Sequence, residues 1–156
     1  MDSFFFKNFL HKKFIQTLII FLLSILLSSI TADEKKEIED IVDSYFKIWS
    51  KGDIQNYSNL FHPTAIIQFK DKSGKIYTES LLPFIESQRL SQNGIPELFT
   101  EVPTNKKIEA GREVSFARVS WRLNGKGKMV TGWDYFIFVR QKDGWKIQYL
   151  LFSNDN

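Results

Sequence analysis

The 156-residue chain contains no cysteine. It therefore cannot form a disulfide bond, use a thiol nucleophile or carry a lipid on a cysteine. Histidine is scarce too, with only His11 and His62, which excludes a histidine-rich zinc site. The chain also lacks a Gly-x-Ser-x-Gly nucleophile motif and a phosphate-binding loop signature. We therefore predict no metal site and no cofactor.

A strong excess of one charge is also missing. The chain has 21 Lys and Arg residues and 18 Asp and Glu residues. Three of these lysines and one aspartate lie in the first 32 residues, so residues 33–156 keep 18 basic and 17 acidic side chains. Proteins that bind nucleic acids usually present clustered basic residues. We therefore predict no nucleic-acid partner.

The beginning of the chain has the order of a secretory signal peptide. Lys7, Lys12 and Lys13 precede an almost uncharged apolar run over residues 14–30, and small residues lead to Ala32. We predict cleavage after Ala32 and export, which makes the protein secreted or periplasmic. The apolar run has 17 positions, the lower limit for crossing a bilayer. An uncleaved membrane anchor is therefore the alternative, and the only membrane association that we predict.

Residues 33–156 are long enough for one domain with a core. Apolar residues spaced by three and four positions predict a helix over 33–51 that ends at Gly52. Asp53 is predicted to cap a short second helix. A strand over 64–69 and a polar turn follow, and the next predicted element is a third helix over residues 79–94.

The pattern of the last third of the chain predicts strands only. Four strand-like runs begin at residue 106, and an antiparallel meander is predicted because the breaks between them contain turn residues. These breaks lie at Gly111, Asn124-Gly125 and Asp143-Gly144. Helices followed by a sheet make the predicted fold class α+β, not alternating βαβ units.

One carboxylate lies within the apolar stretch "TGWDYFIFV". On a strand, Asp134, Phe136 and Phe138 share one face. Burying an unpaired charge is costly, so Asp134 must be paired, protonated or at the wall of a cavity. The opposite face, with Trp133 and Tyr135, is apolar as well. We therefore predict a homodimer, although a curved sheet that wraps its own helices is the alternative.

Other candidates have two interpretations each. His62 is a candidate acid or base, or it closes the second helix by bonding its last carbonyls. Trp49 and Trp121 either line a ligand cavity or belong to the core. Arg118 and Arg122 point to the same face of a strand, where they bind an anion, pair with Asp134 or are solvated.

Several stretches, in order, are similar to the SnoaL-like branch of the nuclear transport factor 2-like superfamily. They are "YFKIWSKGDIQNYSNLFHPTAIIQF", "GREVSFARVSWRLNG" and "GWDYFIFVRQKDGWKIQYLLF". The resemblance covers nearly all of residues 33–153. It implies a cone-shaped roll, in which a curved antiparallel sheet packs on three helices and encloses a pocket. Dimers are common in this superfamily, and its functions range from isomerases and dehydratases to transport adaptors.

Ketosteroid isomerases of this superfamily imply roles for single residues. Their oxyanion hole pairs a tyrosine with a neutral aspartic acid, and the matching positions are Tyr45 and Asp134. The general base of these isomerases matches Phe69, which cannot accept a proton, so steroid isomerisation by that mechanism is not expected. Tyr45 and Asp134 then either act on a ligand or satisfy each other as buried polar groups.

Together these observations predict an exported single-domain protein whose pocket binds a small, largely apolar molecule, with isomerase- or dehydratase-like chemistry. The predicted catalytic residues are Tyr45, Asp134 and His62. The predicted ligand-binding residues are Trp49, Phe69, Trp121, Phe136 and Phe138. The alternative is a non-catalytic, dimeric interaction module with a vestigial pocket.

Overall fold

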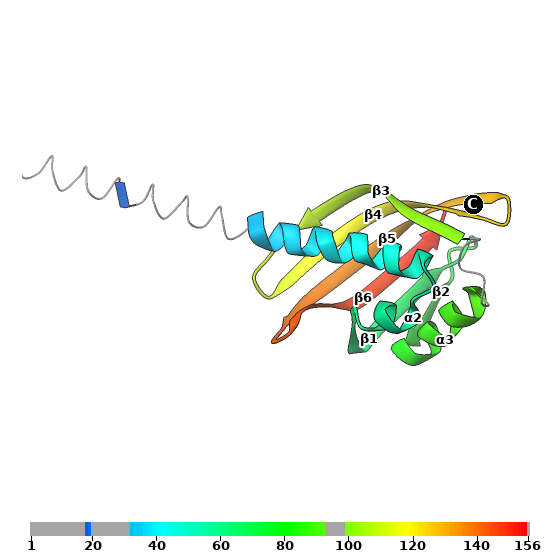
Figure 1. The fold of residues 1–156 in the computed structure, drawn as a ribbon, viewed down its shortest axis with the longest axis horizontal. Helices are drawn as coiled ribbons and strands as arrows, with labels where there is room; N and C mark the ends of the chain where they lie inside the picture. Colours follow the sequence, from blue (N-terminus) through cyan, green and yellow to red (C-terminus); the bar gives the residue numbers. More distant parts are fainter. Residues whose placement is uncertain (1–17, 20–31, 93–98, 156) are drawn as a thin grey trace, which may run out of the picture. The chain divides into compact units, whose positions relative to one another are not determined.

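The computed structural model describes residues 18–19, 32–92 and 99–155. Most of the predicted signal segment, residues 1–32, lies outside these described residues. Within them, no helix combines the length and the hydropathy needed to cross a membrane. From residue 34 onwards the chain forms a compact unit of three helices and six strands among the described residues. Figure 1 shows the helices lying against one face of the sheet.

The first of these helices, residues 32–50, is amphipathic as predicted. Its buried apolar side chains recur at helical spacing, and they are Ile38, Val42, Tyr45, Phe46 and Trp49. The helix ends at Gly52, whose φ of 70° is a left-handed conformation that favours glycine. Helix α2 (Ile54–Ser58) follows, capped by Asp53 as predicted: the backbone N–H of Asn56 donates to its carboxylate at 3.2 Å.

A six-stranded sheet packs against the helices. Its strands run in the order β2-β1-β6-β5-β4-β3. Their bounds are β1 Phe61–Lys70, β2 Ile76–Ser80, β3 Phe99–Glu109, β4 Val114–Gly125, β5 Lys128–Gln141 and β6 Gly144–Asn154. Strands β3 to β6 form the predicted antiparallel meander. The predicted α+β roll of a curved sheet on three helices is confirmed.

Two details of the sheet differ from the prediction. Strand β1 pairs with β6 in parallel, so the sheet is mixed. Strand β2 was not predicted, because residues 76–78 were assigned to no element and residues 79–80 to the start of the third helix. It forms a hairpin with β1, in which Phe69 pairs with Tyr77 and their rings stack. Helix α3 (Leu81–Gln92) therefore begins after β2, and Pro83 lies in its first turn, where a missing backbone N–H breaks no helical hydrogen bond.

The core lies between the helices and the inner face of the sheet. Along β5, Asp134, Phe136 and Phe138 are buried, as expected for one face of a strand, whereas Tyr135 is 41% exposed. Tyr45 from helix 32–50 lies edge-on to Phe136, with ring centroids 5.1 Å apart. The carboxylate of Asp134 thus lies on the core side of the sheet.

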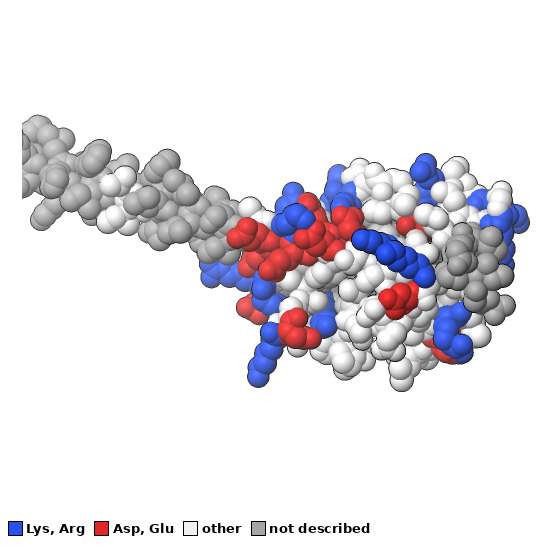
Figure 2. Space-filling model, viewed as in Figure 1, with Lys and Arg blue, Asp and Glu red and all other residues white. Residues whose placement is uncertain are grey.

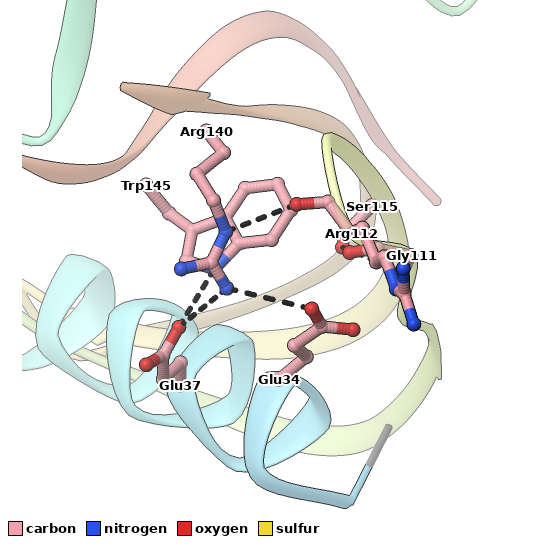
Figure 3. Close-up of polar contacts among 7 residues, drawn as sticks. All are labelled: Glu34, Glu37, Gly111, Arg112, Ser115, Arg140 and Trp145. Carbon is pink, nitrogen blue, oxygen red and sulfur yellow. Dashed lines mark hydrogen bonds and ion pairs between the residues drawn. The ribbon is translucent and has the colours of Figure 1, made fainter. Parts of the chain in front are cut away.

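Arg140 joins the start of helix 32–50 to the sheet (Figure 3). Its guanidinium donates to Glu37 and to the backbone carbonyl of Arg112, both at 3.0 Å, and lies over the ring of Trp145. The Trp145 indole donates to the same Glu37 oxygen at 2.9 Å. Exposed ion pairs contribute little stability, so the main effect of this cluster is to fix the position of the helix.

Charges are spread over the surface in both signs. Figure 2 shows acidic side chains gathered along helix 32–50, with basic side chains near them. One of these pairs is Lys106 with Asp43, at 2.8 Å, which connects β3 to the helix. The outer face of the sheet instead exposes apolar side chains, among them Ile66, Phe116 and Tyr135.

Candidate functional site

A cavity of about 140 Å³ lies between the helices and the inner face of the sheet. A dry cavity of roughly 150 Å³ is known to hold benzene, so this space suits a single ring. Aromatic side chains dominate its wall, together with two carboxyl groups and two amides. The lining residues are Tyr45, Trp49, Tyr57, Phe84, Gln88, Glu101, Trp121, Leu123, Asp134, Phe152 and Asn154.

Asp134 is the most deeply buried acid of the cavity, with 2% of its surface exposed. The Trp121 indole N–H donates to its Oδ1 at 2.6 Å, and Tyr45 lines the same cavity. Burial raises the pKa of Asp134 to about 7, while the hydrogen bonds from Trp121 and Tyr45 act against this rise. Near neutral pH the carboxyl group is therefore divided between its acid and its ionised forms.

A second carboxyl group, that of Glu101, faces the same cavity. Glu101 lies on β3 opposite Leu123 and is half-buried. Burial, and then the negative charge of Asp134, raise the pKa of Glu101 well above its usual range. Two such acids titrate as a pair, so the first proton lost from the cavity belongs to both.

The backbone of Glu101 is tied to the end of helix 32–50. Its N–H donates to the Ser50 hydroxyl oxygen at 2.8 Å, and that hydroxyl donates to the Glu101 carbonyl at 3.1 Å. These two bonds set the start of β3 against the helix that carries Tyr45 and Trp49. Glu101 and Asp134 thus reach the cavity wall from different strands, β3 and β5.

Two phenols complete the polar wall. The rings of Tyr45 and Tyr57 lie 5.0 Å apart, and both residues are buried. Burial raises the pKa of both phenols well above the usual value. They therefore keep their protons at neutral pH and serve as hydrogen-bond donors, not as bases.

Gly132 makes room for the indole that holds Asp134. It lies directly across from Trp121 in the β4–β5 pairing. A methyl group at Gly132 would lie 2.3 Å from the Trp121 ring and 2.2 Å from the Ser153 carbonyl oxygen, closer than atoms can pack. Glycine at this position thus lets the indole lie flat against β5 and reach the carboxylate two residues further along.

The structure brings four of the sequence-predicted residues together at the cavity wall: Tyr45, Trp49, Trp121 and Asp134. The other aromatic candidates lie outside this wall. Phe136 packs beneath Tyr45, and Phe138 stacks on Phe136 in the core. Phe69 contacts the ring of Phe152, which does line the cavity.

His62 does not line the cavity. It lies near the start of β1, where its Nδ1 accepts a hydrogen bond from the backbone N–H of Thr64 at 3.2 Å. The same Nδ1 lies 2.9 Å from the Thr64 hydroxyl oxygen. Both contacts are therefore local to the strand, and neither joins His62 to the end of helix α2. The second ionisable acid at the cavity wall is Glu101.

Glu101 is the site residue that the sequence reasoning missed. The predicted strand began at residue 106, whereas β3 begins at Phe99. With the true start, Phe99 and Glu101 fall on one face by simple alternation. The signal that marks Glu101 is therefore an acid between apolar residues in "LFTEVP", the same kind of signal that identified Asp134.

No basic side chain lines the cavity among the described residues. Nor do His, Asp and Glu side chains form a group of three that could hold a metal ion anywhere in the described part of the chain. The arrangement offers two acids with raised pKa values, two phenols that donate hydrogen bonds, and room for an apolar ring.

The family assignment follows from the domain as a whole. The model of the family described as "Putative lumazine-binding" matches residues 33–153. The chain belongs to this family. The predicted relation to nuclear transport factor 2-like proteins is thereby confirmed. No curated protein matches the sequence.

Solved structures share the fold of this lumazine-binding-family chain at low identity. A "putative dehydratase" of the NTF2-like family from Streptomyces avermitilis has a TM-score of 0.66 and 13% identity, covering 78% of this chain and 96% of its own. A protein from Kribbella flavida has a TM-score of 0.68 and 15% identity, covering 80% of this chain and 93% of its own. An NTF2-like protein from Novosphingobium aromaticivorans has a TM-score of 0.62 and 14% identity, covering 86% of this chain and 88% of its own. At these identities the likeness shows the fold alone.

Proposed function

We propose that this protein binds a small, largely apolar molecule in the cavity and moves a proton on it with Asp134 and Glu101. The observation that carries the proposal is the presence of two acids with raised pKa values in one aromatic cavity. A catalytic acid or base works best when its pKa lies near the working pH, as for Asp134. Pairs of acids with separated pKa values divide naturally into base and acid.

In this proposal the ionised Asp134 removes a proton from a carbon of the ligand, and the neutral Glu101 donates its proton elsewhere. Donation to another carbon or to an oxygen at the end of a conjugated system gives an isomerisation. Donation to a hydroxyl group breaks its C–O bond and releases water, which is a dehydration. The phenol of Tyr45 donates a hydrogen bond to the oxygen that gains charge. The dehydratase description of the Streptomyces avermitilis protein supports the second reaction as a candidate.

Glu101→Gln tests the acid of the pair. The amide keeps the shape of the side chain but cannot supply a proton, so turnover of a substrate should fall by roughly 100-fold or more while ligand binding persists. Substrates are sought by native mass spectrometry of the purified protein and by NMR screening of single-ring carbonyl and hydroxyl compounds. Glu109→Gln, an exposed acid on the same strand, is the matched control. Equal turnover by both variants would contradict the role of Glu101.

A second candidate function is a dimeric interaction module, favoured by the apolar outer face of the sheet. Ile66, Phe116 and Tyr135 there are 47%, 48% and 41% exposed. Tyr135→Glu should convert a dimer to a monomer in sedimentation experiments, because a charge would be buried at the interface. Met129→Glu, at an exposed position near the β4–β5 turn, should leave the sedimentation unchanged. A monomeric wild-type protein would rule the module out.

We also propose that the protein is exported, because the order of basic, apolar and small residues before Ala32 is that of a signal peptide. The intact mass of the protein from its native host should then match a chain that starts at Asp33. A mass that includes residues 1–32 would favour the membrane anchor instead.

A further inference from the structure

Among the residues that the structure describes, the two acids of the cavity have no positive partner. None of the six ion pairs in the described residues involves Asp134 or Glu101, and no lysine, arginine or histidine lines the cavity. The carboxyl group of Glu101 also has no hydrogen-bond donor among the described residues, since only its backbone is bonded. A buried charge without compensation is costly, so the ionised pair has an unmet need for a cation.

The rest of the wall suits a cation as well. Five aromatic residues other than Tyr45 line the cavity, namely Trp49, Tyr57, Phe84, Trp121 and Phe152. The face of an aromatic ring attracts ammonium groups, most strongly for tryptophan and most strongly where water is excluded. Aromatic rings around an acid are the arrangement by which proteins recognise organic ammonium ions. A neutral apolar ligand would use the rings but leave the acids uncompensated.

We propose that the cavity selects a small organic cation: a single ring, or an apolar body of similar size, that carries a protonated amine. The ammonium group pairs with the ionised carboxylate of Asp134 and donates a hydrogen bond to a carboxyl oxygen of Glu101, and the ring lies among the aromatic side chains. The cavity volume of about 140 Å³ sets the size limit. This inference rests on the proposed small-molecule function of the cavity and adds the chemical class of the ligand.

The sign of the pH dependence distinguishes a cationic from a neutral ligand. The ionisable groups that face Asp134 are Glu101 from β3, Tyr45 from helix 32–50 and Tyr57 from α2. The phenols stay protonated, so the charge of the cavity changes through the two acids, with Asp134 titrating at about 7. A cation binds the ionised pair, and its affinity must rise with pH while binding releases protons. A neutral ligand gains nothing from ionisation of the acids and can accept hydrogen bonds from the phenols at any pH in this range, so its affinity must not rise with pH.

The test compares benzylamine, which stays protonated over this range, with benzyl alcohol, which has the same number of heavy atoms and no charge. Calorimetric titrations of the full domain run from about pH 5.5 to about pH 8, with two buffers of different ionisation enthalpy to count protons. The affinity for benzylamine should rise on the order of tenfold across this range, with proton release. At pH 8, benzyl alcohol should bind more weakly than benzylamine.

Two variants distinguish binding in the cavity from binding at the surface. Asp134→Asn should remove most of the pH dependence and weaken benzylamine binding at pH 8 by roughly tenfold, whereas Glu109→Gln should change neither. Stronger binding of benzyl alcohol, or benzylamine affinity that falls with pH, would overturn the cation proposal but leave the small-molecule function intact. Failure of both probes to bind at the cavity, shown by unshifted Trp49 and Trp121 indole NMR signals, would overturn both.

Discussion

Asp134→Asn is expected to stabilise the protein by about 4 kcal/mol at pH 8 relative to the wild type. In the unfolded chain an aspartate ionises near pH 4, as in model peptides. In the folded protein burial holds its pKa at about 7. The raised pKa favours folding fully at low pH, and this advantage is lost as the pH rises through about 7. Asparagine does not titrate and still accepts the Trp121 hydrogen bond, so the variant avoids the loss.

Urea denaturation of both proteins from about pH 4 to about pH 8 measures this difference. The two unfolding free energies should lie close together at the acid end and separate steadily above it, with the wild type falling. Asp143→Asn is the matched control, because Asp143 lies in an exposed turn where a hydrogen bond with Lys146 lowers its pKa. That variant should not gain stability at high pH. Parallel pH profiles for wild type and Asp134→Asn would contradict a buried, protonated Asp134.

Gly132→Ala is expected to destabilise the protein by about 3 kcal/mol, although it adds only one methyl group. The new carbon would lie within 2.3 Å of the Trp121 ring and 2.2 Å of the Ser153 carbonyl oxygen. One contact is backbone, and the other is a large ring held by its bond to Asp134, so neither can yield cheaply. The same change should move the Trp121 indole away from the carboxylate.

Urea denaturation and the NMR signal of the Trp121 indole N–H measure these two effects. Thr131→Ala is a neighbouring control on the opposite face of β5, and its stability should stay within about 1 kcal/mol of the wild type. If Gly132→Ala were as mild as this control, the close packing of Gly132 and Trp121 would be refuted, together with its role in placing Asp134.

Local patterns were sufficient to predict most of the fold. Helix 32–50 follows from apolar spacing and ends at Gly52, where only a left-handed backbone continues the chain. The four C-terminal strands follow from alternation and from turn residues between them. Strand β2 was not predictable in the same way. Its pairing with β1 depends on contacts between side chains of the two strands, such as the stacking of Tyr77 on Phe69. The parallel pairing of β1 with β6 likewise joins distant parts of the chain.

The site divides along similar lines. Asp134 could be identified from sequence because an acid among aromatics on a central strand must be explained. Tyr45 came from the family resemblance, and the structure places both at one cavity. Glu101 was missed because its strand begins seven residues earlier than predicted, at Phe99 instead of residue 106. Its meeting with Asp134 depends on strands β3 and β5 curving over the same helix, which no local pattern specifies.

The stability difference and the chemistry have one cause. A carboxyl group placed among aromatic rings weakens the fold near neutral pH, and the same placement gives it the proton affinity of a catalytic group. Replacing Asp134 should therefore strengthen the fold and abolish ligand chemistry together. If Asp134 were retained for packing alone, replacing it would weaken the fold instead of strengthening it.

The pKa of the Asp134 carboxyl group is the quantity on which these conclusions depend most directly. Carbon-13 NMR of the protein labelled at aspartate and glutamate carboxyl groups follows each acid through a pH titration, and Asp134→Asn assigns the signal by its disappearance. We predict a midpoint of about 7 for Asp134, with the Glu101 signal titrating well above the usual glutamate range. Midpoints near 4 for both acids, as in exposed carboxylates, would contradict a cavity that raises the pKa of both acids.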